Sequence, residues 1–419
     1  MAAAFRTEAA DSTSPSHESR NPFLVPNYRR WWAASVVSAA GGGIQMVTVP
    51  LFITGRVSDD RRAIAIAAAL VCSALPGVFL ALFGGVIADR FERRRILVRT
   101  YTLAAAVSLC YVLLSAGEVG QVWPVFILAG IVGSAAAFTQ PARQSMVPQM
   151  LGQSQLQNGI ILGTVAFMAS AHFLGPMAGG LLADGIGLTS GFSAEVVLLA
   201  LGAVIYSRIA TDRPQPSGHS IRRDLGEGLR YARRSPVIRG LLLLAALPPL
   251  FFVGPLSVTV VLMVQDVFQA RDAFVGILMG CFGIGVLAGS VLMTLRPLPR
   301  RGLLLTGSVI VGGVTFVAYG LSSSAEMAMA VLVFWGLGAA LFINLVVSLL
   351  QESTSKEMMG RVMSMYALAF AAAGPIGFAQ AGALTSLFGP REAIVTSGAV
   401  VAAIGVLAVL FLRPVRSLR

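Results

Sequence analysis

Long apolar segments alternate with short polar ones from about residue 30 to about residue 412. A helix needs about 20 mostly apolar residues to cross a bilayer, and twelve segments meet that condition. The Gly and Pro within them are tolerated in membrane helices, because neighbouring helices satisfy the freed backbone groups. The pattern therefore predicts an all-α membrane protein with twelve transmembrane helices. They fall at about residues 30–54, 64–88, 96–116, 122–142, 157–183, 188–208, 240–265, 273–295, 302–321, 327–350, 361–388 and 392–412.

The composition supports this reading and excludes others. Of the 419 residues, 56% are apolar and only 12% are charged, whereas a soluble domain has about 25% charged residues. A soluble fold would lack polar surface, and a disordered chain would need far fewer apolar residues. Cys72, Cys110 and Cys281 all lie in apolar segments without a CxxC motif, so we expect free thiols. The three histidines show no metal-ligand spacing, and we expect no metal.

The net charge of +12 is distributed unevenly between the two sides of the predicted bundle. With the N-terminus placed in the cytoplasm, most of the 31 basic residues fall in cytoplasmic segments. The outer exceptions are Arg56, Arg61, Arg62, Arg271 and Arg391. This asymmetry follows the positive-inside rule, and it explains the charge without nucleic-acid binding. The chain also opens on a polar stretch with no apolar core of a cleavable signal peptide. We expect a bacterial plasma (inner) membrane protein with both termini in the cytoplasm.

The longest internal polar segment divides the spans into six and six. It contains Ile221, Leu225 and Leu229 at four-residue intervals, surrounded by arginines. This spacing predicts an amphipathic helix on the inner membrane surface, and a plain linker carrying positive charge is the alternative. The expected organisation is a disordered cytoplasmic tail (1–28), an N-terminal six-helix bundle (29–209), a cytoplasmic linker (210–239), a C-terminal six-helix bundle (240–413) and a cytoplasmic tail (414–419).

The two halves share landmarks at similar separations along the chain. Gly85 corresponds to Gly289, and Gly175-Pro176 corresponds to Gly374-Pro375. Pro50-Leu51 likewise corresponds to Pro255-Leu256. The agreement suggests a duplicated six-helix unit. Both copies start on the same side, so an axis along the membrane normal relates them, as in transporters with a midplane cavity between two moving halves.

One motif at the inner end of the second span identifies a family. The segment 85–95 reads Gly-Val-Ile-Ala-Asp-Arg-Phe-Glu-Arg-Arg-Arg. It resembles the signature between spans 2 and 3 of the major facilitator superfamily. Segments 138–151, 158–180 and 360–364 add to the resemblance. Together they are similar to the drug-efflux branch that includes macrolide exporters, siderophore exporters and lysophospholipid transporters. The resemblance implies two pseudo-symmetric six-helix bundles, the major facilitator fold.

The same motif suggests a conformational gate. A carboxylate such as Asp89 at the membrane edge is costly unless it is paired or lies against a helix N-terminus. The resemblance implies that it latches the two halves on the cytoplasmic side. The gate residues are Gly85, Asp89, Arg90, Arg93, Arg94, Arg143 and Arg361. The alternative is a loop that carries only positive-inside charge. Glu92 stands where the family usually has Gly, and a helical segment there would pair it with Arg95.

A second motif, in the fifth span, predicts close helix packing. It consists of Gly175, Pro176, Gly179 and Gly180, and it resembles the end of a longer glycine-rich motif of exporters. Pro kinks the helix and the glycines admit a neighbour. We expect a seam against a stripe in the eighth span, formed by Gly276, Gly280, Gly285 and Gly289. Ordinary packing of small residues is the alternative.

His172 and Glu195 are the candidates for proton coupling. His172 is the only histidine in an apolar segment, and a titratable group at membrane depth is a functional candidate. Its spacing from Gly175 and Gly179 places it in the packing seam instead. Glu195 lies a turn or so inside the sixth span, where a partly hydrated interfacial acid is the alternative.

A substrate cavity is expected between the halves, because spans 1, 4, 7 and 10 line it in the resembling family. Polar uncharged groups and aromatic rings are the candidate lining, and lipid-facing or core packing is the alternative for each. Few polar groups among apolar ones suit a hydrophobic or amphipathic ligand. The candidates are Gln45, Phe52, Phe138, Gln140, Phe252, Trp335, Asn344 and Gln380.

The sequence favours a secondary transporter over an enzyme or an ATP-driven pump. We find no nucleophile–base pair, and the phosphate-binding GxxxxGK[ST] does not occur. We expect a monomeric, proton-coupled exporter (an antiporter) of drugs, siderophores or secondary metabolites, working by alternating access. It would need no cofactor other than the proton gradient, and its partners would be the substrate, protons and membrane lipids. The alternatives are a lysophospholipid or other lipid transporter and a non-transporting scaffold or sensor.

Overall fold

The computed structural model describes residues 21–90, 92–117, 120–210, 230–295 and 299–418, with only the backbone described for residues 81–90 and 294. In these ranges the regular structure is entirely helical. Twelve helical segments are long and apolar enough to cross a membrane, which confirms the predicted fold class. The predicted amphipathic helix falls mostly on residues 211–229, outside the described part.

The N-terminal half contains spans 1 to 6. Span 5 is interrupted by a π-helix at Ser170–Leu174, directly before the Gly175-Pro176 pair, and such π-helical turns are frequent at functional sites. The helices of this half are α1 (Pro26–Thr54), α2 (Asp59–Arg90), α3 (Arg93–Ala116), α4 (Trp123–Met150), α5 (Gln153–Ala169), α6 (Gly175–Gly185) and α7 (Leu188–Ser207).

The C-terminal half repeats this arrangement. Its first span is broken by π-helices at Pro249–Val253 and Met263–Val267, and proline in the first break removes a backbone donor. The helices are α9 (Pro236–Ala245), α10 (Gly254–Leu262), α11 (Ala273–Leu295), α12 (Arg301–Gly320), α13 (Ala325–Glu352), α14 (Met359–Phe388), α15 (Pro390–Phe411) and the short α16 (Arg413–Arg416).

Some helices extend beyond the predicted apolar segments. The sequence pattern ends span 4 near residue 142, but α4 continues to Met150 through Pro141 and Pro148. α1 begins at Pro26, within the stretch assigned to the tail, and α9 begins at Pro236 rather than residue 240. Hydropathy marks only the part of a helix inside the apolar layer, so it misses polar turns at the ends.

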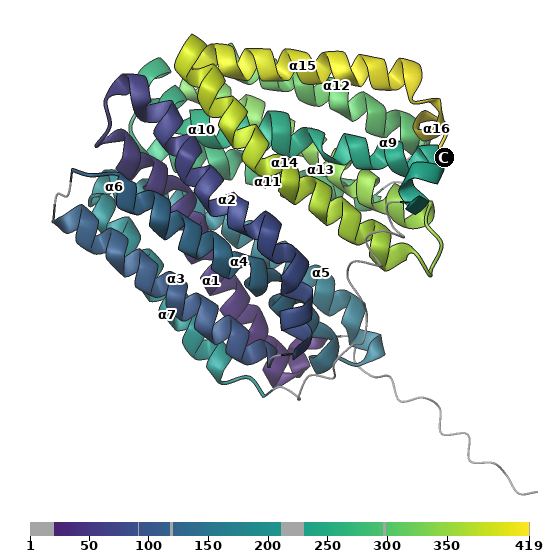
Figure 1. The fold of residues 1–419 in the computed structure, drawn as a ribbon, viewed down its shortest axis with the longest axis horizontal. Coiled ribbons are helices and arrows are strands. Elements are labelled where there is room, and N and C mark those ends of the chain that lie inside the picture. The colour runs from purple at the N-terminus through teal and green to yellow at the C-terminus, as the bar shows by residue number, and fades with distance from the viewer. Residues whose placement is uncertain (1–20, 91, 118–119, 211–229, 296–298, 419) are drawn as a thin grey trace, which may run out of the picture.

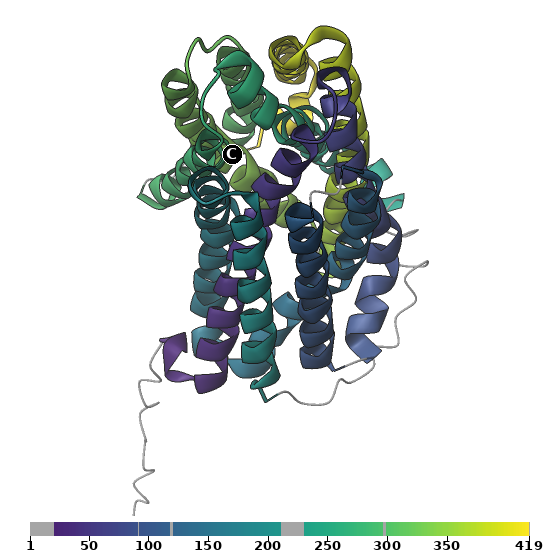
Figure 2. The same ribbon diagram turned by 90° about the vertical axis from the view of Figure 1, so that its left-hand side faces the viewer.

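The two bundles correspond helix by helix. α2 packs on α4 and α3 on α7 in the first half, while α11 packs on α13 and α12 on α15 in the second. The halves meet through α2 against α14 and through α6 against α11. Figure 1 shows the two bundles, with α2 and α14 close together at the upper left and diverging toward the lower right, and Figure 2 gives the perpendicular view. This correspondence agrees with the repeat seen in the sequence.

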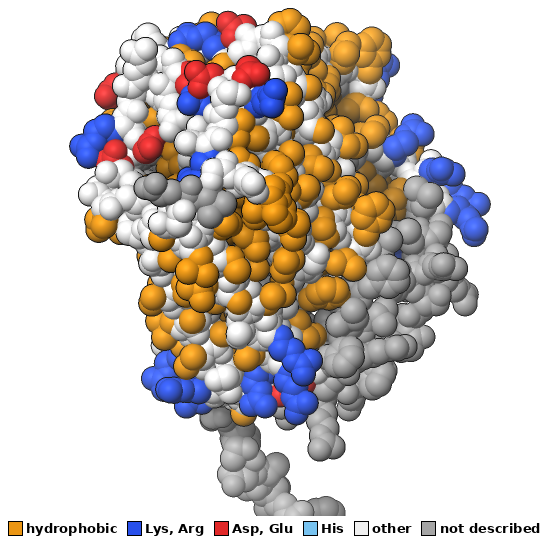
Figure 3. All heavy atoms as spheres, turned by 60° about the vertical axis from the view of Figure 1, so that its left-hand side comes forward, with side chains coloured by type: hydrophobic (Ala, Val, Ile, Leu, Met, Phe, Trp, Pro, Cys, Tyr) orange, Lys and Arg blue, Asp and Glu red, His pale blue; other side chains and the backbone are white. Residues whose placement is uncertain are grey.

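With twelve spans, the chain enters α1 and leaves α15 on the same side, which we call the termini side. The turns after α1 and before α11 lie on the opposite side, which we call the far side. Figure 3 shows apolar side chains over the middle of the visible face, Lys and Arg at its lower edge, and mixed acidic and basic groups at the top. An apolar band between two charged rims is the surface a membrane requires.

Candidate functional site

Glycines bring α6 and α11 into contact near the far side. A Cβ added at Gly180 would lie 2.9 Å from the backbone oxygen of Ala273 and the nitrogen of Gly276. A Cβ at Gly276 would overlap the backbone oxygen of Pro176. Since these neighbours are backbone atoms, they cannot move aside as a flexible side chain could. Only glycine allows the two halves to approach this closely here.

The glycines of the predicted seam have two different partners. Gly180 and Gly276 join the halves as expected, and Gly280 packs against Phe173. Gly179, however, faces α1, where a Cβ would lie 3.0 Å from the oxygen of Ile44. Gly175 likewise packs on α1, against Ala40 and Gly43.

Two glycines of the expected stripe in α11 face their own half. Gly285 packs against Val333 and Gly336 of α13, and Gly289 packs against Leu337 and Ala340. The expectation of one continuous seam was wrong for them. Spacing along a helix does not reveal which of two adjacent helices a face meets.

Two ion pairs also join the halves on the far side. Arg62 of α2 lies 3.2 Å from Asp266 of the π-helix Met263–Val267, and 2.8 Å from Asp59 in its own helix. Arg271, in the turn before α11, pairs with Asp184 of α6. Each pair joins one exposed side chain, Asp266 or Arg271, to one that is half-buried, Arg62 or Asp184. Ion pairs that water reaches stabilise a protein by only about 0–1 kcal/mol each. That is enough to bias one conformation over another without fixing it.

The second interface between the halves also closes near the far side. A Cβ added at Gly382 of α14 would overlap the Cβ of Ala67, and it would lie 3.3 Å from the oxygen of Ala63 in α2. Both alanines lie in the first turns of α2, and Gly382 lies near the end of α14. The glycine contacts and the ion pairs therefore seal the far side.

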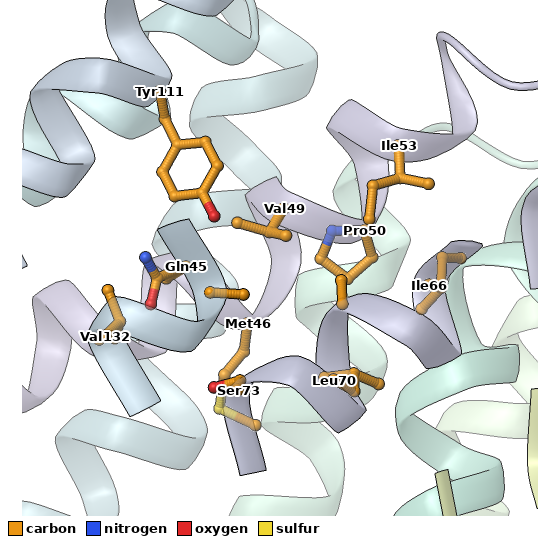
Figure 4. Close-up of a pocket in the computed structure, with 13 residues that line it drawn as sticks. Gln45, Met46, Val49, Pro50, Ile53, Ile66, Leu70, Ser73, Tyr111 and Val132 are labelled. Atoms are coloured by element: carbon orange, nitrogen blue, oxygen red, sulfur yellow. The ribbon is translucent and has the colours of Figure 1, made fainter. Parts of the chain in front are cut away.

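A pocket of about 140 Å³ lies among α1, α2, α3 and α4. Its walls are mostly apolar, and Gln45 and Ser73 contribute polar groups (Figure 4). The hydroxyl of Tyr111 also reaches its wall and donates a hydrogen bond of 3.4 Å to the oxygen of Val125. The lining is Gly42, Gln45, Met46, Val49, Pro50, Ile53, Ile66, Ala69, Leu70, Ser73, Tyr111, Ala129 and Val132.

The comparisons identify the family. A family model described as transmembrane secretion effector matches residues 18–418. The protein belongs to this family, within the major facilitator superfamily. The chain is 24% identical over 403 residues to macrolide efflux protein A of Streptococcus pyogenes, covering 91% of this chain and 96% of that protein. It is 26% identical over 401 residues to the enterobactin exporter EntS of Escherichia coli, covering 94% of each chain.

Solved structures share the fold of this transporter. The nucleoside transporter NupG has a TM-score of 0.69 at 14% identity, with 94% of this chain and all of that chain covered. The human organic anion transporter MFSD10 (TETRAN) has a TM-score of 0.66 at 16% identity, covering 92% of this chain and 99% of that chain. The family and its relatives are multi-pass membrane transporters of the efflux type, and they are not enzymes.

Several expected cavity residues of the transporter lie in its aromatic cores instead. Phe52 has no exposed surface and packs edge-on against Tyr111 and Phe192. Trp335 is 4% exposed, and its ring contacts those of Phe252, Phe282 and Phe316. In this conformation these rings hold helices together. Composition alone cannot distinguish a ring that lines a cavity from one that packs a core.

The remaining cavity candidates have mixed surroundings. Gln45 lines the pocket. The side chain of Asn344 donates hydrogen bonds to the oxygen of Ala340, at 2.8 Å, and to the hydroxyl of Ser290, at 3.3 Å. Phe138 is half-buried against the cluster formed by Tyr28, Trp31 and their neighbours, and Gln380 is half-buried in α14. Gln140 is exposed and bonds to Arg143, as described below.

The latch remains a prediction. Gly85, Asp89 and Arg90 are in α2, but their side chains lie outside the described part. The neighbouring turn is described: Glu92 lies 2.8 Å from Arg94 and 2.6 Å from Arg95. The expected pairing of Glu92 with Arg95 is thus confirmed.

The other gate candidates have different positions. Arg93 begins α3, and its Nε is buried without a hydrogen-bond partner among the described residues. Arg361 lies near the start of α14, with its Nη1 3.3 Å from the sulfur of Met358. Arg143 interacts within its own half, with Gln140 and the ring of Phe167.

Of the two proton-coupling candidates, Glu195 is fully buried and His172 is exposed. His172 does lie in the seam through its backbone, since a Cβ added at Gly283 of α11 would lie 2.8 Å from its oxygen, while its side chain is exposed. Ser108 of α3 donates a 2.6 Å hydrogen bond to Oε1 of Glu195, and Oε2 has no partner among the described residues.

The far-side ion pairs were missed by the sequence analysis. The charge asymmetry marks Arg62 and Arg271 only as exceptions, and no sequence pattern singles out Asp184 or Asp266. The available signal was an acid and a base at the far-side ends of spans in opposite halves. The sequence alone does not show that those ends meet.

Proposed function

We propose that the transporter is a proton-coupled exporter of hydrophobic or amphipathic small molecules, working by alternating access. The observation that carries the proposal is the seal on the far side, made by Gly180 with Gly276 and by the pairs Arg62–Asp266 and Arg271–Asp184. Because one partner of each pair is exposed to water, the pairs can break at low cost. A protein sealed on one side by reversible contacts has the form that alternating access requires.

The charge distribution supports an orientation in the membrane, and the relatives support a direction of transport. The excess of basic residues favours a termini side in the cytoplasm. In that orientation the sealed far side faces outward, and the described conformation faces the cytoplasm. This is the state in which an exporter takes up its substrate. Macrolide efflux protein A and the enterobactin exporter EntS are both named as exporters, and this similarity supports export over import.

The pocket lies within the N-terminal half and not between the halves as expected, and its volume of about 140 Å³ would hold only part of a drug-sized molecule. Its lining, however, supports the substrate class. Its walls are mostly aliphatic, and Gln45 and Ser73 offer a small number of hydrogen-bonding groups. Such a lining favours an apolar molecule with few polar groups and disfavours a sugar, which would need many hydrogen bonds.

Glu195 is our proposed proton carrier. Its partner Ser108 lies 2.6 Å from Oε1 of Glu195 and 2.9 Å from the oxygen of Ala104. A serine hydroxyl carries one hydrogen, so it can donate to only one of these two oxygens. A protonated Glu195 would donate to Ser108 and leave the serine hydrogen for Ala104. Both contacts are then satisfied, which supports reversible protonation at this position.

The proposal is tested by export from cells that overproduce the protein. A panel of hydrophobic and amphipathic dyes and antibiotics is screened for lower accumulation and raised resistance. We expect lower accumulation of at least one compound, restored to the level of empty-vector cells by a protonophore. Accumulation that stays low after the gradient collapses would contradict proton coupling, and no change for any compound would contradict export of this class.

A lipid is a second candidate substrate, favoured by a separate groove. About 440 Å³ of mostly apolar space lies between α9 and α14, lined by Leu242, Leu243 and Leu368. The exposed Arg233 and Arg239 also line it, at the termini side. An acyl chain beside an anionic head group fits this arrangement. Uptake of a fluorescent lysophospholipid by inverted vesicles, reduced in Arg239→Gln, would favour this candidate.

A further inference from the structure

Arg143 is a buried cation in the middle of the N-terminal half. It lies on α4, about 10 Å along the helix from the end at Met150, and is only 5% exposed. Its guanidinium carbon lies 3.8 Å from the ring centre of Phe167. Its Nε and Nη2 both donate to the side-chain oxygen of Gln140, at 3.3 and 3.0 Å.

Among the residues the structure describes, no carboxylate forms an ion pair with this guanidinium. The nearby polar groups are neutral: Tyr101 and Tyr206 are stacked on each other, and the hydroxyl of Tyr206 lies 2.8 Å from that of Ser35. Burying a charge without an opposite charge is expensive. A cation–π contact offsets only about 0.5–2 kcal/mol of that cost.

The bond to Gln140 occupies a specific part of the guanidinium. Nε and Nη2 form the edge that binds a carboxylate or phosphate through two parallel hydrogen bonds. A neutral amide oxygen now accepts both of those bonds. Gln140 is itself exposed, so its side chain can rotate away and leave the edge free for a ligand.

Arg143 lies on the same helix, α4, as two residues that line the pocket. Ala129 and Val132 line the pocket, and Gln140 and Arg143 follow on the same face of the helix, since they recur at three- and four-residue steps. This face runs from the pocket toward the termini side. A molecule arriving from that side would therefore meet Gln140 and Arg143 before it reaches the pocket.

We propose that Arg143 and Gln140 form a recognition site for the anionic group of the substrate, so that the transporter preferentially binds amphipathic molecules carrying a carboxylate or phosphate. In the empty protein Gln140 occupies the binding edge of Arg143, and the ligand's anionic group replaces it. The inference rests on the proposed function, because it specifies which amphipathic molecules the exporter takes.

The test compares two ligands that differ only in charge. Dansyl-undecanoate and its primary amide are titrated against the purified full-length protein in nanodiscs, with empty nanodiscs as background. We expect the wild type to bind the acid about tenfold more tightly than the amide, the scale of lost charge-assisted hydrogen bonds. In Arg143→Gln the affinity for the acid should fall to that for the amide.

Two further variants complete the design. Arg99→Gln removes an exposed cation elsewhere in the same half, and it should leave the preference unchanged. Gln140→Ala frees the guanidinium edge, so affinity for the acid should rise about threefold while that for the amide stays constant.

A wild type without preference for the acid, or an Arg143→Gln protein that keeps it, would overturn the site. If Arg143→Gln does not fold, Gln140→Ala decides, and unchanged or weaker binding of the acid then refutes the proposal. Equilibrium binding needs neither a proton gradient nor a transport direction. Failure here is thus separate from failure of export.

Discussion

Glu195 and Arg143 show how differently a membrane protein can hold two buried ionisable side chains. Glu195 bonds to one serine hydroxyl, and its second oxygen has no partner in the described part of the chain. Arg143 lies over an aromatic ring and bonds to a neutral amide. Neither side chain has an ion-pair partner among the described residues. We propose that each responds to something that arrives, a proton at Glu195 and an anion at Arg143.

Replacing Glu195 by Gln tests whether the carboxyl group of this residue carries the coupled proton. The amide keeps the size of the side chain and can donate to Ser108, so we expect normal yield and thermal stability. It cannot exchange a proton, and protonophore-sensitive efflux of the compound found in the screen should disappear. Glu326→Gln, at an exposed acid on the far side, is the matched control and should transport normally. Full efflux in Glu195→Gln would exclude this carboxyl as the carrier.

The aromatic core around Trp335 gives a prediction of stability. Trp335 is 4% exposed and contacts three other rings, whereas its neighbour Phe334 is 57% exposed. We expect Trp335→Ala to lower the free energy of unfolding by about 3–5 kcal/mol. Phe334→Ala should have a small effect, because little of its surface is buried. Thermal unfolding of both variants in the same detergent measures the difference, and equal shifts would contradict the assignment of Trp335 to the core.

At the scale of elements, the glycine contacts decide how closely helices of opposite halves approach. The contact between α6 and α11 depends on glycine at positions where a Cβ would meet backbone. The π-helix at Ser170–Leu174 lies directly before this contact, and the backbone oxygen of His172 within it faces Gly283 of α11. Glycine thus acts here through close approach of backbones rather than through local flexibility.

Gly276→Ala should weaken the far-side seal. Its Cβ would overlap the oxygen of Pro176, so we expect the equilibrium to shift toward conformations open on the far side. Spin labels at Arg61 and Leu387, both exposed on that side, report the distance between α2 and α14 in a background with the three cysteines replaced. The label distance should increase.

The matched control for that variant is Gly307→Ala in α12. A Cβ there would have open space within 4 Å, and the label distance should not change. A Gly276→Ala protein with the wild-type distance distribution would show that the contact is not required for closure.

At the scale of the whole molecule, the two halves are held on the far side by charge as well as by close packing. Reversing one charge in Arg62→Asp should repel Asp59 and Asp266 and open the far side. The second change Asp266→Arg should restore an attractive pair between the halves and bring the distance between the same two labels back toward the wild-type value. If the double variant opens as far as the single one, the pair does not contribute to closure.

On the termini side, the latch prediction concerns the opposite conformation. Asp89→Asn removes the charge without changing the size of the side chain. We expect folded protein, with yield and thermal stability unchanged, and efflux reduced to the empty-vector level. Substrate accumulation in cells measures the effect, and normal efflux in this variant would refute the latch.

The sequence by itself determined the large features of this protein. Twelve apolar segments, the excess of basic residues on one side and the repeated landmarks predict the membrane fold and its two halves. These features are readable because a bilayer imposes one requirement on every span, which is enough apolar length with its backbone satisfied internally. The motif at residues 85–95 identified the superfamily in the same way, since it is contiguous in the chain.

Only the tertiary structure decided which residues meet. It placed Phe52 and Trp335 in cores, divided the glycine motif between α1 and α11, and brought Arg62 to Asp266 across the halves. It also showed that Arg143 has a neutral partner. Contacts between distant segments depend on how each helix is rotated about its axis and on the conformation of the whole protein. In a span that is apolar all round, the sequence pattern carries almost no signal of that rotation.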